Sequence, residues 1–404
     1  MYQKNLIYIT AIAAIVSAPF DARVGAAAYE YLVTDLGVTG GPQGAAYAIN
    51  STGAVVGFTT TASADCHAVY FDGALIDLGT LGIDDQSMAF SINDAEQVAA
   101  QSYRLGELQS HAMLWQGGTA TNLGHFAPRD INGAGLIVGH LTTFLNDLWV
   151  DHACKWQAGI LTDLGTLGGR NSRAFAVDTS GRAVGQSYLM DDQTVRACLW
   201  LNGIPHDLGA LDGAANSSAT DINDSGRIVG WSDTASGAPH AFSVQVDSTG
   251  IVITRTDLGT LENTFSVAYG LNSAGDVVGT SNSRAVLWRG NQVIDLNTRI
   301  PSGAGWVLGR AHAINTAGQI VGEGAHVGFP HGYLLTPVTC TKGDVNDDGA
   351  RNGLDIQAFV QVLLVGGTPR QVCAGDVGAN PDGELTTDDV EAFAQCLLET
   401  GGCQ

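Results

Sequence analysis

The sequence predicts an all-β seven-bladed β-propeller with four-stranded blades, followed by a small α-helical pair of EF-hand type. Three observations lead to this prediction. A unit of about 44 residues recurs seven times between residues 31 and 337, a period typical of stacked supersecondary units. Charged residues are only 14% of a chain with 53 glycines, a composition typical of turn-rich β structure. Residues 340–404 contain the spacing of a calcium-binding loop.

Residues 1–28 form a predicted signal peptide. Lys4 precedes an apolar run from residue 6 to residue 18, and residues 26–28 are alanines suited to cleavage. The run is too short to span a bilayer, so we expect an extracellular protein, secreted or attached to the cell surface, with no membrane span after cleavage. A retained membrane anchor is the alternative. The net charge of −22 argues against nucleic acid as a partner.

Each repeat contains four strand-like segments. The first ends at Asn or Asp, and a glycine follows three residues later in six of the seven units, which is the chemistry of a tight hairpin. The second segment follows at once. The third opens with His or Arg and has apolar residues at its third and fifth positions, on one face of a strand. The fourth contains Asp-Leu-Gly or a close variant. The hairpin residues are Asn50, Asn93, Asn132, Asp178, Asn223, Asn272 and Asn315.

The order of segments at the two ends distinguishes a closed ring from an open solenoid. The repeat region begins with a fourth segment at residues 31–37 and finishes with a third segment at residues 331–335. We therefore predict that the N-terminal strand completes the last blade within a propeller domain of residues 29–338. This closure protects the edges of the sheets, whereas a solenoid would need atypical capping repeats.

The repeats resemble the HAF repeats of bacterial extracellular proteins. The His-Ala-Phe that gives those repeats their name stands here as His240, Ala241 and Phe242. The resemblance covers about three quarters of the chain. It implies an extracellular location, and it implies no particular biochemical activity.

Two sets of repeat residues are predicted to be structural. The His or Arg that opens each third segment should hold the turns of its blade by hydrogen bonds, because equivalent positions in different blades diverge radially and cannot form a metal ring. Cys154 and Cys198 occupy one core position in neighbouring units. Facing sheets pack about 10 Å apart, beyond the reach of a disulfide, so we predict two buried free thiols.

Asp130 and Asp221 are the candidate catalytic residues of the propeller. They stand two positions before the hairpin Asn, where the other units have small residues. Ligands usually bind propellers where the innermost strands converge, and two acids there could perform acid–base chemistry. The alternative is that each acid accepts a hydrogen bond from a nearby backbone donor or pairs with Arg129.

The C-terminal segment, residues 340–404, is predicted to bind Ca²⁺ through two EF-hand loops. The first has oxygen donors at positions 1, 3, 5, 7, 9 and 12 and glycine at 6. Apolar residues at helical spacing follow it, and the half repeats 34 residues later. The second loop has Gly378 where the first carboxylate is expected. The predicted ligands are Asp344, Asn346, Asp348, Ala350 (carbonyl), Asn352 and Asp355, and in the second loop Asp376, Asn380, Asp382, Glu384, Thr386 and Asp389.

These paired loop–helix halves resemble type I dockerins over about 60 residues. The resemblance implies a cohesin-type protein as partner, bound through the helices and through Gly353, Leu354, Thr387 and Asp388. These are not the hydroxyl-bearing pairs of the best-known dockerins, and a calcium-stabilised terminal domain without a cohesin is the alternative. Cys340, Cys373, Cys396 and Cys403 allow three disulfide pairings that the sequence does not distinguish.

The sequence thus predicts a secreted, non-catalytic binding or structural propeller, attached to a partner through a calcium-dependent module, with polysaccharide as the expected ligand class. The alternative is a polysaccharide-active enzyme, a glycoside hydrolase or lyase, because dockerins usually accompany such enzymes. An enzyme would show two acids roughly 5–9 Å apart beside a cleft.

Overall fold

The computed structural model describes residues 30–107, 109–145, 147–338 and 355–365, together with residues 26, 27, 345, 371, 374, 384, 385, 389, 392 and 393. The chain divides into two compact units. One unit, Val33–Asn297 with Gly305–Leu335, is built from the repeats. The other comprises Met1–Leu32, Thr298–Ala304 and Thr336–Gln404. Most of the predicted signal peptide lies outside the described residues.

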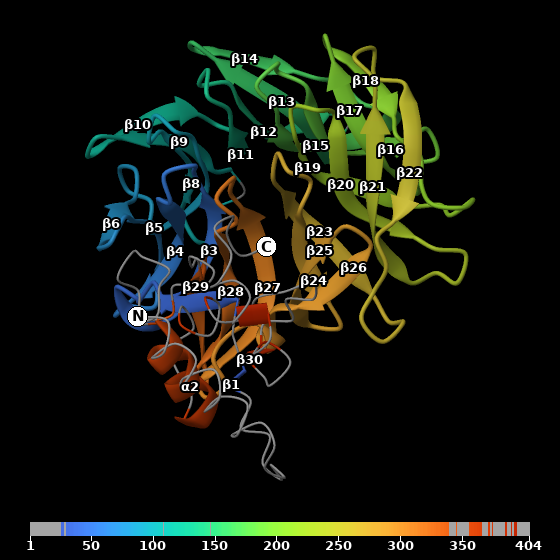
Figure 1. The fold of residues 1–404 in the computed structure, drawn as a ribbon. Coiled ribbons are helices and arrows are strands. Elements are labelled where there is room, and N and C mark those ends of the chain that lie inside the picture. Colours follow the sequence, from blue (N-terminus) through green and yellow to red (C-terminus); the bar gives the residue numbers. More distant parts are fainter. Residues whose placement is uncertain are drawn as a thin grey trace. The chain divides into compact units, whose positions relative to one another are not determined.

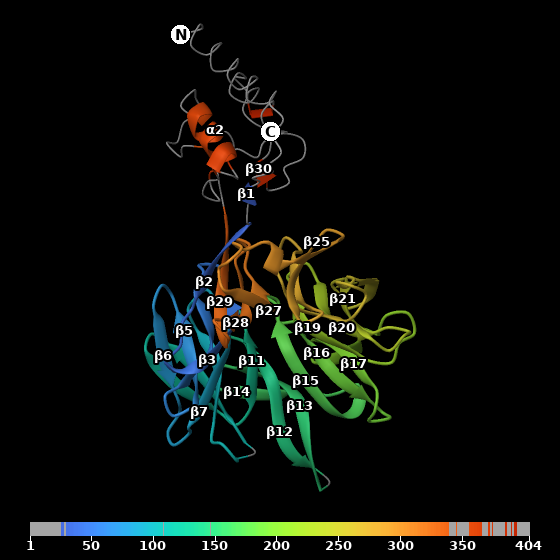
Figure 2. The ribbon, with the colours of Figure 1, turned by 90° about the horizontal axis from the view of Figure 1, so that it is seen from below.

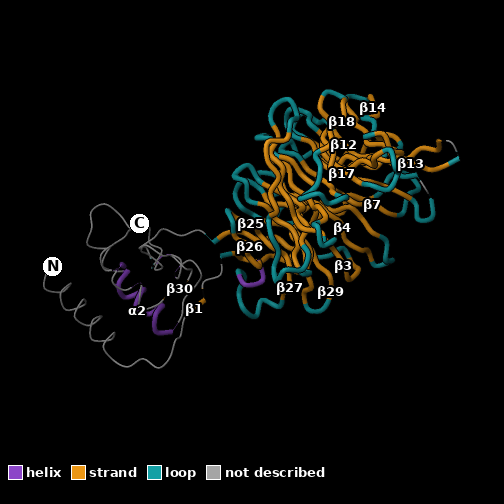
Figure 3. The backbone as a smooth tube through the Cα atoms, turned by 90° about the vertical axis from the view of Figure 1, so that its right-hand side faces the viewer, coloured by secondary structure: helices purple, strands orange, loops and turns teal. Residues whose placement is uncertain are grey.

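The repeats form seven four-stranded antiparallel sheets arranged around one axis, with the first strand of each unit innermost (Figures 1 and 3). The first three blades are β3 (Gly40–Ile49), β4 (Val55–Thr61), β5 (Cys66–Phe71), β6 (Leu75–Gly79); β7 (Gln86–Ile92), β8 (Val98–Tyr103), β9 (His111–Gln116), β10 (Thr119–Gly124); and β11 (Ala127–Ile131), β12 (Ile137–Leu145), β13 (Leu148–Gln157), β14 (Ile160–Asp163). The next three are β15 (Gly168–Val177), β16 (Ala183–Leu189), β17 (Val195–Leu201), β18 (Ile204–Asp207); β19 (Ser217–Ile222), β20 (Arg227–Asp233), β21 (Pro239–Val246), β22 (Val252–Asp257); and β23 (Ser266–Leu271), β24 (Val277–Ser281), β25 (Arg284–Arg289), β26 (Gln292–Asp295).

The seventh blade takes its outermost strand from the N-terminal end of the repeats. Its strand order is β2-β29-β28-β27, in which β2 is Tyr31–Asp35, β27 is Trp306–Ile314, β28 is Ile320–His326 and β29 is Phe329–Pro337. The backbone N–H of Leu36 donates to the carbonyl of Gly332 at 3.1 Å, just beyond the end of β2. The predicted closure of a seven-bladed propeller is confirmed.

The hairpin asparagines connect each blade to the next. Oδ1 of Asn50 accepts the N–H of Ala54 at 2.9 Å and so closes its own turn, while its Nδ2 donates to the carbonyl of Asn93 in the next blade at 3.4 Å. Five other asparagines make the same inter-blade bond, at 2.9–3.4 Å, and the last of these leads from Asn315 back to Asn50. The side-chain amide places an acceptor oxygen and a donor NH₂ on one planar group, so a single asparagine can make both bonds, which explains the asparagine at this position. We call this set the Asn ring.

The unit with aspartate at this position uses a substitute donor. The side chain of Asp178 has no N–H donor. Instead, Arg182 binds the Asp178 carboxylate and donates to the carbonyl of Asp224 in the next blade at 3.1 Å. At this one place in the Asn ring, an arginine side chain makes the inter-blade hydrogen bond that an asparagine amide makes in the other units.

The His residues of the third segments are scaffold, as predicted. Nδ1 of the histidine lies 2.7–3.0 Å from the aspartate of the fourth segment in the pairs His67–Asp77, His152–Asp163, His240–Asp257 and His331–Asp35. The same carboxylate accepts an N–H from the chain two residues later, for example Gly79 at 2.8 Å. In the second blade Asn122 replaces the aspartate, and His111 contacts Asp84 instead, at 3.0 Å.

The hydrophobic core lies between neighbouring blades, and it contains both predicted free thiols. Cys154 packs with Phe126 and Ile131, and Cys198 packs with Trp200 in a separate cluster. Both cysteines are fully buried and unpaired. Burial raises the pKa of the Cys154 thiol to about 12, so this thiol is unreactive at neutral pH.

The second unit contains the helix α2 (Asp355–Val365), which begins at the last predicted ligand of the first loop. Phe359 on this helix stacks on Phe393 with ring centroids 3.9 Å apart. These residues occupy equivalent positions in the predicted duplication, and so do Asp355 and Asp389, which are both buried. A two-residue strand β1 (Ala26–Ala27), within the predicted signal peptide, pairs with β30 (Glu384–Leu385), which contains the predicted ligand Glu384.

The other predicted residues of the C-terminal segment lie outside the described residues. They are Asp344, Asn346, Asp348, Ala350, Asn352, Asp376, Asn380, Asp382, Thr386, Gly353, Leu354, Thr387, Asp388, Cys340, Cys373, Cys396 and Cys403. A short 3₁₀ helix, η1 (Leu296–Thr298), follows β26. Across the described part of the chain, no helix has the length and apolar character needed to cross a membrane.

Candidate ligand-binding site

Every innermost strand contains a β-bulge at the same repeat position. In β3 the register against β4 shifts between Ala46 and Ala48, so that Tyr47 has no opposite residue. The same shift occurs in the other six blades. Bulges redirect side chains and are over-represented beside active sites. The seven bulged residues, which we call the bulge ring, are Tyr47, Phe90, Arg129, Phe175, Thr220, Tyr269 and His312.

Glycine in the second strand makes room for the bulge. In the fifth blade a Cβ on Gly230 would lie 2.0 Å from the carbonyl oxygen of Ser218, a distance that no side chain tolerates without a backbone shift. The equivalent position is glycine in every blade except the second, which has the buried Ala100. The Val-Val-Gly phrase of the sequence is thus part of the bulge geometry.

Five members of the bulge ring form a continuous series of contacts across five blades. Tyr47 stacks on Phe90 with centroids 5.8 Å apart and 8° between the planes, and it meets His312 edge-on at 5.2 Å. His312 in turn lies 5.3 Å from Tyr269, and the guanidinium of Arg129 lies 4.2 Å from the ring centroid of Phe90. All seven members are half-buried, so each keeps some accessible surface near the axis.

Arg129 is a cation without an acid partner among the described residues. The neighbouring arginines are neutralised, since Arg173 donates to Asp151 at 2.9 Å and Arg310 donates to Glu323 at 2.6 Å. Burial, and secondly repulsion by Arg173, lower the pKa of Arg129. A partly desolvated guanidinium gains most from a carboxylate or phosphate that it can bind with two parallel hydrogen bonds. The site is therefore suited to a ligand with an anionic group.

Two histidines beside Arg129 and Tyr47 keep a ring nitrogen without a hydrogen bond. Nε2 of His312 has no donor or acceptor within hydrogen-bond distance among the described residues, and the nearest carboxylate oxygen, on Glu323, is 3.9 Å away. Nδ1 of His140 in β12 likewise has no hydrogen-bond partner among the described residues. Burial lowers the pKa of both histidines to about 4, so both are neutral at pH 7. Both nitrogen atoms are buried and shielded from solvent.

The β12–β13 hairpin extends the site away from the Asn ring. Along β12, His140 is level with the bulge, opposite Ala127 of β11, and Phe144 lies near the tip. Phe144 and Trp149 contact each other at the tip with centroids 5.3 Å apart, and they are 54% and 48% exposed. Figure 2 shows this hairpin projecting beyond its neighbours. Exposed aromatic rings thus continue the face that the bulge ring begins.

The two candidate catalytic acids lie next to the bulge ring and bind the scaffold. Asp130 accepts a hydrogen bond from Ser91 Oγ at 2.6 Å and one from the N–H of Val177 at 2.8 Å. Asp221 accepts one from the N–H of Leu271 at 2.9 Å. Val177 and Leu271 belong to the innermost strand of the next blade, whose inner N–H groups have no further strand to bind. This geometry agrees with the structural alternative for both acids.

The environment of the two acids favours their neutral form. Burial raises the pKa of both carboxyl groups, and that of Asp221 reaches about 7. Arg129, which could have paired with Asp130, lies over Phe90 instead.

Replacement of Asp221 by asparagine should stabilise the propeller most at neutral pH. The pKa of this carboxyl is about 7 in the folded chain against 3.8 unperturbed, so its contribution to stability is fully present below pH 3.8 and is lost as the pH rises through 7. Asparagine carries no charge and keeps an acceptor for Leu271, but it places an NH₂ group where Asp221 accepts the N–H of Ile222 at 2.8 Å, which offsets part of the gain. We expect the advantage of the variant over wild type to grow between about pH 4 and pH 7 and to level off above pH 7, at on the order of 1–3 kcal/mol in denaturant unfolding. An advantage independent of pH would contradict this interpretation, and Asp221→Ala, without the acceptor, should be less stable than Asp221→Asn.

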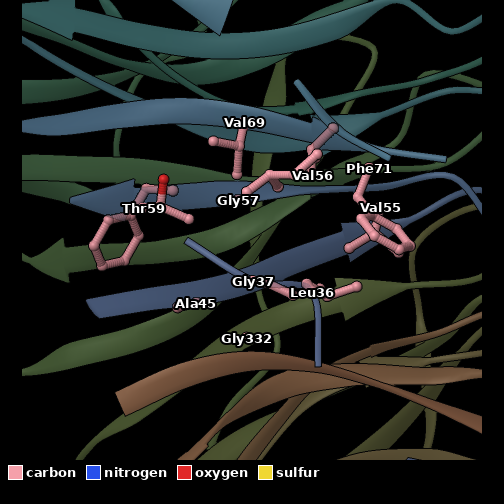
Figure 4. Close-up of a pocket in the computed structure, with 13 residues that line it drawn as sticks. Leu36, Gly37, Ala45, Val55, Val56, Gly57, Thr59, Val69, Phe71 and Gly332 are labelled. Atoms are coloured by element: carbon pink, nitrogen blue, oxygen red, sulfur yellow. The ribbon is translucent and has the colours of Figure 1, made fainter. Parts of the chain in front are cut away.

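Two hollows of the propeller lie away from the bulge ring. The pocket in Figure 4, lined by Leu36, Ala45, Val56 and Val69, is apolar and holds about 10 Å³, roughly the space of one water molecule. A groove of about 250 Å³ between the third and fourth blades is lined by polar groups near the hairpin turns and by Lys155. The groove also contains Trp200, but no set of mutually stacked aromatic rings like that of Tyr47 and Phe90 is found among its described lining residues.

The bulge ring was missed by the sequence analysis, which selected the neighbouring position. Asp130 and Asp221 stood out because they break a run of small residues, whereas the bulged position varies from unit to unit. A signal was nevertheless present. In most units a large side chain stands between two small ones, as Tyr47 does between Ala46 and Ala48.

The architecture defines the class of protein as a seven-bladed β-propeller. No protein-family model matches the chain, and no curated protein matches it. Among solved structures, it is similar to TolB from Acinetobacter baumannii, with 12% identity, a TM-score of 0.42 and coverage of 70% of this chain and 64% of that one. It is similar to a puromycin hydrolase with 13% identity, a TM-score of 0.45 and coverage of 76% of this chain and 52% of that one. It is also similar to the extracellular domain of the one-component system BT4673 from B. thetaiotaomicron, with 10% identity, a TM-score of 0.47 and coverage of 76% of this chain and 40% of that one. The chain thus spans 40–64% of the length of these three proteins, and the likeness concerns the fold alone.

Proposed function

We propose that the propeller is a non-catalytic binding protein for a polysaccharide, and that its ligand site is the bulge ring together with the β12–β13 hairpin. The observation that carries the proposal is the bulge repeated in all seven blades, which gathers four aromatic side chains, a neutral histidine and an unpaired arginine near one axis. A cluster of apolar faces with a few convergent polar groups is typical of small-ligand sites.

The chemistry of the site matches a sugar chain that carries acidic groups. The faces of Tyr47 and Phe90, and of Phe144 and Trp149 at the hairpin tip, can pack against the C–H faces of sugar rings. Arg129 can bind the carboxylate of a uronic acid through two parallel hydrogen bonds. We therefore expect acidic polysaccharides to bind more tightly than neutral ones.

A non-catalytic role is supported by the state of the two candidate acids. Both Asp130 and Asp221 use their side-chain oxygens to bind backbone N–H groups of the next blade, which gives both acids a structural role in joining neighbouring blades. The enzyme alternative requires these acids to act on a sugar beside them, and their hydrogen bonds give it no support.

Export and attachment complete the proposal. The predicted signal peptide of residues 1–28 would place the propeller outside the cell. The dockerin-like segment of residues 340–404 would bind Ca²⁺ and attach the propeller to a cohesin-type protein. The support for these two statements comes from the sequence, together with the buried Asp355 and Asp389 and the stacked Phe359 and Phe393 in the second unit.

A binding screen tests the proposed function. The purified chain in 1 mM Ca²⁺ is mixed with insoluble or immobilised polysaccharides, both neutral and uronate-containing, and the bound fraction is measured beside the release of reducing ends. We expect retention on uronate-containing polymers, lost at high salt because the arginine contact is screened, and no release of reducing ends. Release of reducing ends that Asp130→Asn or Asp221→Asn abolishes would establish the enzyme alternative.

A further inference from the structure

The seventh blade contains a cluster of metal-binding side chains that the other blades do not have. Oδ2 of Asp35 lies 2.9 Å from Nδ1 of His326 and 3.0 Å from Nδ1 of His331. These three residues form the sole group of three or more His, Cys, Asp or Glu side chains, across the described part of the chain, whose ligand atoms converge within 4.8 Å of one another. His331 and Asp35 form the histidine–aspartate pair that recurs in other blades, and His326 is a second histidine on the same aspartate.

The geometry around the cluster suits a transition metal ion. In a tetrahedral zinc site with bonds of about 2.0–2.1 Å, neighbouring ligand atoms lie about 3.3 Å apart. Each histidine nitrogen therefore needs to move only a few tenths of an ångström away from Oδ2 of Asp35, and the two nitrogens lie within 4.8 Å of each other. The other carboxylate oxygen of Asp35 accepts the N–H of Gly37 at 2.9 Å, which fixes the carboxylate and leaves Oδ2 for an ion. The indole of Trp306 lies parallel to the His326 ring at 4.5 Å and fixes its orientation.

The cluster is accessible, and its donors select the ion. The three side chains are between 17% and 29% exposed, so an ion can enter and a water can take the fourth position. Two imidazole nitrogens with one carboxylate favour Zn²⁺ and its transition-metal neighbours over Ca²⁺ or Mg²⁺, which prefer oxygen donors. Such an ion would differ in chemistry from the one proposed for the C-terminal segment.

The cluster joins the N-terminal strand of the propeller to the last two strands of the repeats. Asp35 lies on β2, the N-terminal strand, whereas His326 lies on β28 and His331 on β29. Asp35 is almost 300 residues away from both histidines in sequence, and the pairing of β2 with β29 closes the ring. An ion bound to all three residues would join the two ends of the propeller in the folded state alone, and it would therefore stabilise that state.

We propose that Asp35, His326 and His331 form a zinc site that fastens the closure of the propeller. Three arms test it, all with the full chain freed of transition metals and kept in saturating Ca²⁺: wild type, His326→Ala, and His152→Ala as the matched control. His152 is the repeat histidine of the third blade, paired with Asp163 at 2.7 Å, and the metal-binding group of the seventh blade does not include it. Zn²⁺ at a hundredfold excess over its Kd should raise the Tm of wild type and of His152→Ala by about 4 °C and leave His326→Ala unchanged.

Cobalt gives a second readout. Co²⁺ in the same site should produce visible d–d absorption in wild type and none in His326→Ala. His326→Gln replaces the alanine variant if that protein does not fold. An equal zinc response in wild type and in both His326 variants, or a cobalt spectrum that survives the loss of His326, would overturn the proposal.

Discussion

Proline at Thr34 is expected to cost the propeller several kcal/mol more than the same substitution at Thr162. Both threonines are exposed and precede the aspartate of an outermost strand, Asp35 in β2 and Asp163 in β14. Since alternate N–H groups of a strand face the same neighbour, Thr34 points its N–H toward β29 as Leu36 does, and Thr162 points toward β13 as Leu164 does. Each proline therefore removes one equivalent ladder bond.

The difference between the two variants comes from the connectivity of the blades. β14 is followed directly by the fourth blade, so its detachment leaves the covalent link between the third and fourth blades intact. β2 provides the link between the first and last blades, and its loss separates the chain ends by a loop of about 300 residues, whose closure entropy is on the order of 5 kcal/mol. We expect Thr34→Pro to lose roughly 2–4 kcal/mol more than Thr162→Pro in urea unfolding, with reduced cooperativity. Equal losses would show that the first and last blades hold together without β2.

Calcium is expected to produce the second large effect, on the C-terminal segment. The first loop offers five side-chain ligands with one carbonyl, and without an ion its carboxylates repel one another. Residues 340–404 are too few to form a large core, so binding to the folded state should stabilise this segment by several kcal/mol at millimolar Ca²⁺. We expect calorimetry on the full, disulfide-intact chain to show one strong site and one weaker site, since Gly378 replaces the first carboxylate of the second loop.

Paired variants separate the two loops. Asp344→Ala should abolish the strong site, and Asp376→Ala should affect the weaker one alone. Both substitutions remove one carboxylate from the same segment, so they are matched in charge. A titration in which neither variant changes the heat of binding would remove the calcium assignment, and with it the best support for a dockerin-like module.

The sequence predicted the propeller because the signals for its fold are short-range and repeated. The turn chemistry of Asn50 and Gly53 recurs in nearly every unit, and period-two apolar residues place each strand. Closure followed from the order of segments at residues 31–37 and 331–335. The free state of Cys154 and Cys198 followed from the spacing of packed sheets.

The candidate site could not be predicted in the same way, because it depends on register. A bulge shifts pairing by one residue, and this shift decides that Arg129, rather than Asp130, lies over Phe90 in the preceding blade. The convergence of His326 on Asp35 was equally hidden, since these residues are distant in sequence and His326 belongs to no repeated phrase. Both features arise from one blade meeting another.

We propose that the bulge ring binds an acidic polysaccharide, and titration calorimetry of Arg129→Ala is the decisive experiment. The titrant is the uronate-containing polymer that the screen retains best, and Arg104→Ala is the control, an exposed arginine beside Glu107 in another loop. Because Arg129 lacks an acid partner in the fold, its removal should leave Tm within about 2 °C of wild type, while affinity falls tenfold or more, equivalent to about 1.4 kcal/mol. Arg104→Ala should bind as wild type does. Unchanged affinity in Arg129→Ala and in Tyr47→Ala, with both proteins folded, would contradict the claim.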